Sequence, residues 1–348
     1  MIRQILQVLL LLGALPAMAH AQETNGNIQE SEWVAYKERF VAENGRVIDD
    51  ANGRISHSEG QGYGLLLALL ANDRADFARI WTFTNTRLLL RDDGLAVWKW
   101  DPDAEPHVSD PNNASDGDLL IAYALARAGT QWNDARFTDA ARQIATALAD
   151  EAVFEQNDRL MLRPGVVGFG ADDRPDGPVV NLSYWVFEAF PVLAELVPAV
   201  DWEALGRGGL DLAREAGFGA RKLPSDWISI ADEAQPAERF PAEFSYNAVR
   251  IPLYLMRAGL DDTALLRRFR EGIAGANGGL ALVDVRSGEV KEELMDVGYR
   301  IIPALADCVL DGTPLPAELK QFAPTAYYPS TLHLLGLSYA REEQQQCL

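Results

Sequence analysis

Residues 58–64 read Ser58-Glu59-Gly60-Gln61-Gly62-Tyr63-Gly64, and apolar residues at helical spacing run from Tyr63 to Leu70. The alternating glycines do not form the dinucleotide phosphate-binding fingerprint, because no strand precedes them and their spacing is wrong. A carboxylate at the start of a helix is ordinarily stabilised by the free backbone N–H groups there. The stretch therefore predicts a helix that begins beside Glu59.

The rest of the chain is also mostly helical in pattern. Apolar residues recur at helical spacing in at least five further segments, which are Leu119 to Ala128, Phe137 to Leu148, Trp185 to Leu196, Ala248 to Met256 and Thr331 to Leu337. With weaker segments, the count reaches roughly eleven or twelve helices. The clearest strand signal is Leu280 to Val285, with Ser287-Gly288 as a turn and Val290 beyond it, which predicts one small hairpin. The segments are not self-similar, so a helical solenoid is not indicated.

The first residues indicate export. Arg3 precedes an apolar run from Ile5 to Leu15, and small residues end near Ala21, so residues 1–21 are predicted to be a cleavable signal peptide. No later segment is apolar for long enough to span a bilayer. Residues 22–348 contain no linker or composition break, so we expect a single domain, monomeric, in the periplasm or secreted. A disulfide between Cys308 and Cys347 stays open; it would hold only the polar tail.

The charge balance excludes two classes of partner. The formal net charge is −20, and loss of Arg3 with the signal peptide makes it −21. Such a chain repels nucleic acid phosphates and anionic membrane surfaces. We interpret the charge as favouring solubility, with attraction of a cationic polymer such as chitosan as the alternative.

The remaining chemistry is that of carboxylates among aromatic rings. The few histidines lack metal-site spacing, and no Gly-x-Ser-x-Gly elbow occurs, so no metal or cofactor is expected. A carboxylic acid that protonates a leaving oxygen and a second carboxylate are the requirements of glycosidic bond cleavage. Aromatic faces suit the C–H surfaces of a neutral sugar polymer. The long loop from Arg91 to Asp116 carries Trp98 and Trp100 among several aspartates.

Four segments resemble glycoside hydrolase family 8 in order and separation. Residues 58–64 are similar to its acid-bearing motif, and the run Ala114 to Leu125 (ASDGDLLIAYAL) resembles its signature. Asn181 to Trp185 (NLSYW) and Phe244 to Pro252 (FSYNAVRIP) are similar to two further family segments. With Ala96 to Pro102 (AVWKWDP), the likeness is greatest to the periplasmic endoglucanases associated with bacterial cellulose synthases.

The resemblance implies an (α/α)6 barrel with long loops, an endo-acting and inverting hydrolysis of β-1,4-glucan, and no cofactor. It also implies a link to a cellulose synthase complex. The runner-up interpretation is a chitosanase or xylan-active relative. A glucan-binding accessory protein of little or no activity is the rival from outside the enzymes.

The resemblance implies that Glu59 is the general acid, which requires burial or a nearby like charge to outweigh the helix N-terminus. Asp116 would hold the distorted sugar or act as the second carboxylate, although it also fits an N-cap. Asp118 is interpreted as structural, and Trp185 is as consistent with the core as with the cleft. The residues expected to contact substrate are Tyr63, Trp98, Trp100, Asn113, Tyr184, Tyr246, Asn247 and Arg250.

Two of these residues leave alternatives open. Arg250, one helical turn after Tyr246, either holds a site carboxylate or makes a surface ion pair. Asn247 stands where many relatives carry Asp as the general base, and an amide does not accept a proton usefully near neutral pH. Another carboxylate then serves as base, Asp116 first and Glu243 or Asp296 as weaker candidates, or the protein is slow or inactive. Residues 327–329 are expected to edge the cleft.

Overall fold

The computed structural model describes residues 26–348, so the predicted signal peptide, residues 1–21, lies outside the described residues. The described part contains the following α-helices: α1 (Glu30–Phe40), α2 (Ser58–Leu70), α3 (Arg74–Arg87), α4 (Ser115–Gln131), α5 (Ala135–Ala152), α6 (Ala189–Leu196), α7 (Trp202–Glu215), α8 (Ile251–Arg257), α9 (Thr263–Gly272), α10 (Val297–Asp311) and α11 (Tyr327–Glu343). Short 3-10 helices are η1 (Leu182–Tyr184), η2 (Ala248–Arg250), η3 (Ala317–Leu319) and η4 (Gln345–Cys347). The prediction of an all-α protein is confirmed.

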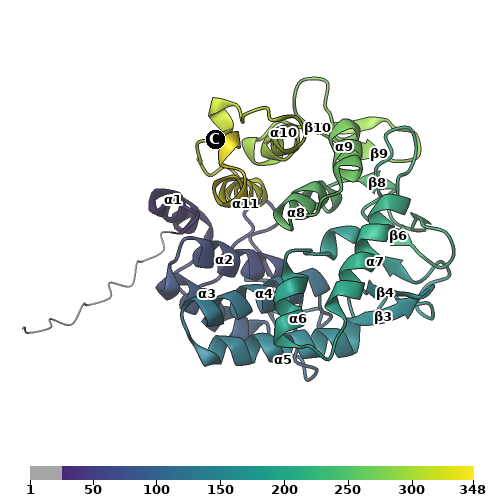
Figure 1. Cartoon of the computed structure of the whole chain (residues 1–348). Coiled ribbons are helices and arrows are strands. Elements are labelled where there is room, and N and C mark those ends of the chain that lie inside the picture. The colour runs from purple at the N-terminus through teal and green to yellow at the C-terminus, as the bar shows by residue number, and fades with distance from the viewer. Residues whose placement is uncertain (1–25) are drawn as a thin grey trace, which may run out of the picture.

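The described helices include inner ones, buried around their circumference, and outer ones, which bury one face. Helices α2, α4, α8 and α11 are buried on nearly all sides. Helices α3, α5, α7 and α9 bury one face, as amphipathic helices at a surface do. In Figure 1 the inner helices lie at the centre of the ribbon and the outer ones around them. This ring of helices is the (α/α)6 barrel that the resemblance implies.

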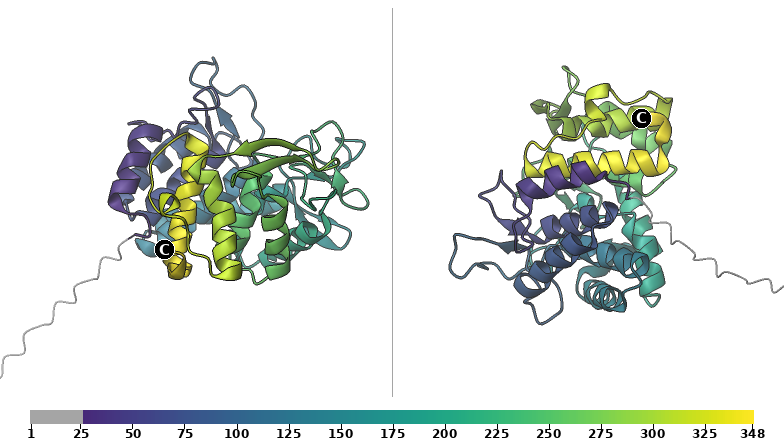
Figure 2. Two further views of the ribbon diagram at one scale, coloured as in Figure 1. Left: turned by 90° about the horizontal axis from the view of Figure 1, so that it is seen from above. Right: turned by 90° about the vertical axis from the view of Figure 1, so that its left-hand side faces the viewer.

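The last helix closes the ring against the first ones. Helix α11 packs on α10, on α2 and on α1, so the two ends of the described chain meet. Figure 2 shows α1 and α11 side by side. The closure places the start of α11, at Tyr327, next to the start of α2.

Glycines set the close packing of α2 on α4. A Cβ at Gly62 would lie 2.5 Å from the Cβ of Leu120, and one at Gly117 would lie 2.1 Å from Ser58 Oγ and 2.6 Å from the backbone N of Glu59. Real side chains do not tolerate such distances. Gly62 and Gly117 therefore allow the N-terminal parts of the two helices to touch.

Short strands lie in the loops. The strands are β1 (Ser56–His57), β2 (Lys99–Trp100), β3 (Val153–Gln156), β4 (Arg159–Leu162), β5 (Val179–Val180), β6 (Ile228–Ser229), β7 (Gln235–Pro236), β8 (Glu243–Phe244), β9 (Leu280–Asp284) and β10 (Val290–Leu294). The expected hairpin is confirmed as β9–β10, and β8 adds a third strand to it. The hairpin β3–β4 was not predicted. Within residues 26–348, no helix has the length and apolar character needed to cross a bilayer.

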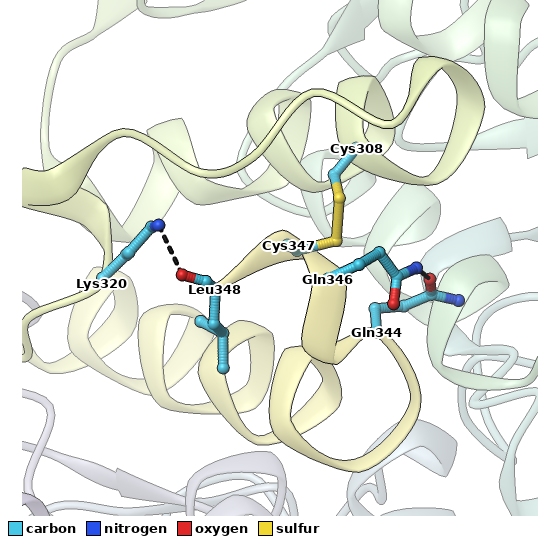
Figure 3. Close-up of a disulfide and its surroundings, with 6 residues drawn as sticks. All are labelled: Cys308, Lys320, Gln344, Gln346, Cys347 and Leu348. Carbon is cyan, nitrogen blue, oxygen red and sulfur yellow. Dashed lines mark hydrogen bonds between the residues drawn. A yellow bond between two sulfur atoms is a disulfide. The ribbon is translucent and has the colours of Figure 1, made fainter.

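A disulfide joins Cys308 of α10 to Cys347 of η4 (Figure 3). The backbone N–H of Leu315 donates to the carbonyl of Cys347, and Lys320 Nζ donates to the carbonyl of Leu348 at 2.6 Å. The pairing that the sequence left open is thus made, and it fastens the C-terminal tail to an outer part of the barrel.

Candidate active site

A cavity of about 810 Å³ opens where the inner helices begin. Its wall comes from α2, α4, η2, β10 and the start of α11, together with the loops before them. The lining residues are Asp49, Ala51, Asn52, His57, Ser58, Glu59, Trp98, Ala114, Asp116, Tyr184, Tyr246, Asn247, Arg250, Glu292, Glu293, Leu294, Met295, Asp296, Tyr299, Ala326, Tyr327, Tyr328 and Pro329. The wall therefore combines carboxylates with aromatic rings, which is the composition a glycan-cleaving site needs.

Glu59 and Asp116 both lie in the first turn of an inner helix. Glu59 is the second residue of α2 and Asp116 the second residue of α4. The contact made possible by Gly117 brings these two helix ends together. The Glu59 side chain is 20% exposed, whereas Asp116 is 1% exposed. The two predicted catalytic carboxylates thus share one wall, and Glu59 is the more accessible of them.

Arg250 binds both carboxylates. Its Nη2 donates to Asp116 Oδ2 at 2.6 Å, and its Nη1 lies 3.4 Å from Glu59 Oε2. The guanidinium also lies over the rings of Tyr184 and Tyr254, at 5.7 and 6.0 Å from their centroids. Arg250 is 2% exposed. The interpretation of Arg250 as a surface ion pair is therefore wrong, and it holds the site carboxylates.

The environment of Asp116 shifts its proton affinity. Burial, followed by the negative charge of Glu59, raises the pKa of Asp116 to about 7, although Arg250 and the Gly117 N–H oppose the shift. The Gly117 N–H donates to Oδ1 at 2.8 Å, so both oxygens of Asp116 already accept hydrogen bonds. Burial and the neighbouring negative charge therefore favour the protonated form of Asp116.

His57 positions the start of α2 and was not recognised from the sequence. It is the N-cap of α2, and its Nδ1 accepts from the Gly60 N–H at 2.9 Å. The hydrogen then resides on Nε2, which lies 3.5 Å from Asp49 Oδ2. The His57 ring meets the Tyr327 ring edge-on, with centroids 5.7 Å apart. Asp49, His57 and Tyr327 thus form the part of the cavity wall around Glu59.

Asn247 lies in the cavity wall at the N-terminal end of η2. Its Nδ2 donates to Asp226 Oδ2 at 3.3 Å. Asp226 Oδ1 accepts from the backbone N–H groups of Ser245 and Ala248, each at 2.9 Å. Asp226 was missed in the sequence because it precedes Asn247 by 21 residues and no local pattern marks it.

The loop before α4 brings Trp98 into the cavity wall. Trp98 Nε1 donates to Asp110 Oδ2 at 2.8 Å, and the Trp98 carbonyl accepts from the Ser58 N–H at 3.0 Å. Asp118 fixes this loop to α4, since its Oδ1 accepts from the Ala96 N–H at 2.8 Å. Asp118 faces away from the cavity, in agreement with a structural role.

Three residues expected to contact substrate do not line the cavity. Trp100 packs edge-on against Phe83, with centroids 5.6 Å apart, and lies beneath Arg46. The hydroxyl of Tyr63 bonds that of Tyr254 inside the barrel. The amide of Asn113 is buried, where Nδ2 donates to Asp118 and Oδ1 accepts from the Val166 N–H. These three side chains support the site from behind, so their assignment to the cleft is corrected.

The other residues expected to contact substrate do line the cavity. Trp98, Tyr184, Tyr246, Asn247 and Arg250 all line the cavity, as do residues 327–329. Trp185 is fully buried, and its Nε1 donates to the Leu205 carbonyl, so it belongs to the core.

Of the weaker base candidates, Asp296 lines the cavity and caps α10, with the Gly298 N–H donating to it at 2.9 Å. Glu243 is absent from the lining and lies 3.7 Å from Lys291 Nζ. Glu292 and Glu293, on β10, line the cavity and were not recognised from the sequence.

Comparisons with known proteins identify the family of the chain. Residues 4–342 match the family described as glycosyl hydrolases family 8. The chain is 33% identical over 320 residues to a probable endoglucanase of Novacetimonas hansenii, covering 90% of this chain and 91% of that protein. It is 39% identical over 228 residues to an endoglucanase of Cellulomonas uda, but this alignment spans 65% of the chain and 63% of that relative.

Solved structures give the same result. The endoglucanase Cel10 of Klebsiella pneumoniae, a family 8 glycosyl hydrolase, superposes with a TM-score of 0.80 at 34% identity, covering 91% of this chain and 100% of that one. The endo-β-1,4-glucanase CMCax of Acetobacter xylinum superposes with a TM-score of 0.80 at 32% identity, covering 90% and 98%. The chain belongs to glycosyl hydrolase family 8.

Proposed function

We propose that this glycoside hydrolase is an exported endo-β-1,4-glucanase that cleaves cellulose-type chains with inversion. The observation that carries the proposal is that Glu59 and Asp116 both contact the Arg250 guanidinium in the wall of an aromatic-lined cavity. The family membership and the relatives named endoglucanases support the substrate. In the cell, we propose that it trims glucan made by a cellulose synthase.

Glu59 is the proton donor to the leaving oxygen in this proposal. It is the more accessible of the two paired carboxylates, and Arg250 lies closer to Asp116 than to Glu59. The shorter contact of the guanidinium is the one with Asp116, and a carboxylic acid exposed at the cavity wall is the group that general acid catalysis requires. Protonation of the glycosidic oxygen from this wall would leave the opposite face of the sugar free for water.

Asp116 then holds the sugar at the cleavage point. Both of its oxygens accept hydrogen bonds within the protein, and it is almost fully buried, so little room is left beside it for a water molecule. A fixed carboxylate of this kind stabilises positive charge that develops at the anomeric carbon. In this proposal Asp116 therefore holds the sugar and is no longer the first candidate for the general base.

Aromatic rings supply the binding surface for the polymer. Trp98, Tyr184, Tyr246 and Tyr299 line the cavity, and Tyr246 meets Tyr299 with ring centroids 6.2 Å apart. Stacked rings hold the C–H faces of pyranose units while the carboxylates and amides bond their hydroxyls. A row of rings along an open cavity is suited to internal segments of a chain, which is what endo-action requires.

A second substrate has one observation in its favour. Glu292 is exposed on β10, accepts from the Tyr246 hydroxyl at 3.2 Å, and has no cationic partner among the described residues. With Glu293 and Asp296 it makes one edge of the cavity acidic. An acidic edge would attract the ammonium groups of chitosan. Chitosan is therefore the alternative substrate.

The test is the release of reducing ends from carboxymethylcellulose, chitosan and xylan by the purified enzyme. We expect the wild type to be most active on carboxymethylcellulose and E59Q to lose about 10²- to 10⁴-fold in activity. Glu289 is an exposed acid between β9 and β10 outside the cavity, so E289Q should keep full activity. A preference for chitosan that E292Q removes would favour the alternative. NMR of the first products should show the α-anomer, and a β-anomer would exclude inversion. Binding of cello-oligosaccharides without any cleavage would favour the accessory-protein rival.

A further inference from the structure

Asp226 is a buried carboxylate without a cation. It is 8% exposed, and no ion pair to it occurs within residues 26–348. Burial of an unpaired charge is costly, so such a group is a candidate for a functional role that its surroundings must then decide. Asp226 accepts from the backbone N–H groups of Ser245 and Ala248 and from the Asn247 side-chain amide, and the backbone N–H of Asn247 also faces it. The Asp226 carboxylate is thus surrounded by hydrogen-bond donors and acts as an acceptor.

Asn247 separates Asp226 from the cavity. Asn247 lines the cavity, whereas Asp226 does not. Because the Asn247 Nδ2 donates to Asp226 Oδ2 at 3.3 Å, the planar amide turns its Oδ1 to the side away from Asp226. That oxygen is an acceptor for a water molecule in the cavity. Asp226 can therefore act on such a water only through the Asn247 amide.

We propose that Asn247 holds the nucleophilic water and that Asp226, acting through the Asn247 amide, takes up its proton. The inference rests on the proposed function. It identifies the source of the base in a chain whose cavity carries an amide where many relatives carry a carboxylate. Asn247 is the residue that contacts the reacting water, and Asp226 is a positioning residue behind it.

The proton transfers balance as follows. The water O–H bond breaks while Asn247 Oδ1–H forms, and Nδ2–H breaks while Asp226 Oδ2–H forms, which leaves the side chain of Asn247 as an imidic acid. The electron pair of the broken O–H bond forms the new bond to the anomeric carbon. The glycosidic C–O bond breaks, and its oxygen receives the proton of Glu59. After release, Asp226 returns its proton to Nδ2, Oδ1 gives its proton to solvent, and Glu59 regains one.

The surroundings of Asp226 favour its role as acceptor. Burial raises the pKa of Asp226 above its ordinary range, against the N–H donors that lower it. A carboxylate with greater proton affinity is a stronger base toward the amide. An Asp at position 247 would meet the Asp226 carboxylate across the same 3.3 Å contact, so the two acids would share a proton. An amide at position 247 can donate a hydrogen bond to the Asp226 carboxylate, whereas a second carboxylate there would not.

The test exchanges the two groups. In D226N, kcat on cello-oligosaccharides should fall by about 10²- to 10⁴-fold with KM changed less than about twofold, because a general base contributes on this scale. In D226N/N247D the carboxylate faces the cavity directly and the amide supports it, so kcat should recover by about tenfold or more over D226N. The control for loss of a buried carboxylate is D176N, since Asp176 is equally buried at 8% and accepts from the Glu238 backbone N–H, although it also pairs with Arg174. D176N should keep the wild-type kcat.

Several outcomes would overturn the proposal. They are a D226N enzyme with wild-type kcat, a loss in D226N that the exchange does not reverse, or a loss in D176N as large as that in D226N. If D226N does not fold, N247L keeps the backbone N–H donors of Asp226 and should show the same loss of kcat; full activity in N247L overturns the relay. A wild type inactive on every β-1,4-glucan would instead refute the proposed function, and E59Q separates the two by reporting the acid alone.

Discussion

Gly117→Ala tests whether the contact of two helix ends fixes the catalytic geometry. A Cβ on Gly117 would lie 2.1 Å from Ser58 Oγ and 2.6 Å from both Ser58 Cβ and the Glu59 backbone N. Rotation of the serine hydroxyl cannot relieve the last two contacts, so α4 must move away from α2. Asp116 would move with α4, and Glu59 would stay with α2.

The expected magnitude follows from this displacement. Overpacking of a tight contact costs about 1–3 kcal/mol, against which alanine returns up to about 1 kcal/mol of helix propensity. The net cost is up to about 3 kcal/mol, so for a chain of this size the Tm should fall by up to about 4 °C. Displacement of a catalytic group by about 1 Å costs about 10²-fold in rate, so kcat on carboxymethylcellulose should fall on that scale. Calorimetry and a reducing-end assay measure the two effects.

Gly206→Ala is the matched control. Gly206 also lies in a helix, α7, where an added Cβ meets only the ring of Phe190, at 3.2 Å and beyond. G206A should keep full activity with a Tm near the wild type. If G117A matched G206A in both assays, the reasoning that the α2–α4 contact sets the distance between the carboxylates would be wrong.

Three further predictions concern charge and the tail. E59Q should lower kcat by about 10²- to 10⁴-fold with the Tm preserved, while E289Q is unchanged in both. Because the pKa of Asp116 is raised from 3.8 to about 7, the native state binds this proton more tightly than the unfolded chain, and stability falls as the pH rises from about 4 to about 7. The decline of Tm across this range should be shallower in D116N, and an equal decline would contradict the shift. Removal of the disulfide in C308S/C347S should cost roughly 2–4 kcal/mol in urea unfolding without loss of activity, since neither cysteine lines the cavity.

The helices were predictable because their apolar spacing is local. The hairpin β9–β10 was also local, marked by Ser287-Gly288 between two strands. The hairpin β3–β4 was missed although Asn157 and Asp158, both with positive φ, form its turn. That pair is a hairpin signal of the same kind as Asn-Gly. The ring closure of α11 on α1 is a contact between the ends of the chain, and only the family resemblance predicted it.

The site was predictable where a helix start carries the residue. Glu59 and Asp116 each occupy the first turn of a helix, and Arg250 follows from its spacing in the same motif as Asn247. Trp100 was assigned to the cleft on the assumption of a regular alternation with Trp98. The loop is held by Asp118, and only Trp98 reaches the wall. Asp226 belongs to a different loop, so its contact with Asn247 could not be read from spacing.

Shifted proton affinity does not by itself separate catalytic from structural acids in this barrel. Burial raises the pKa of Asp118 to about 7, the same value that Asp116 reaches. Asp118 directs its oxygens at the Ala96 N–H and the Asn113 amide, behind the loop that carries Trp98. Asp116 lines the cavity and shares Arg250 with Glu59. The direction of the oxygens does not separate Asp226 from Asp118, because both accept from backbone N–H groups and an Asn amide. The two differ in the amide that they hold, since Asn113 is buried behind the loop whereas Asn247 forms part of the cavity wall.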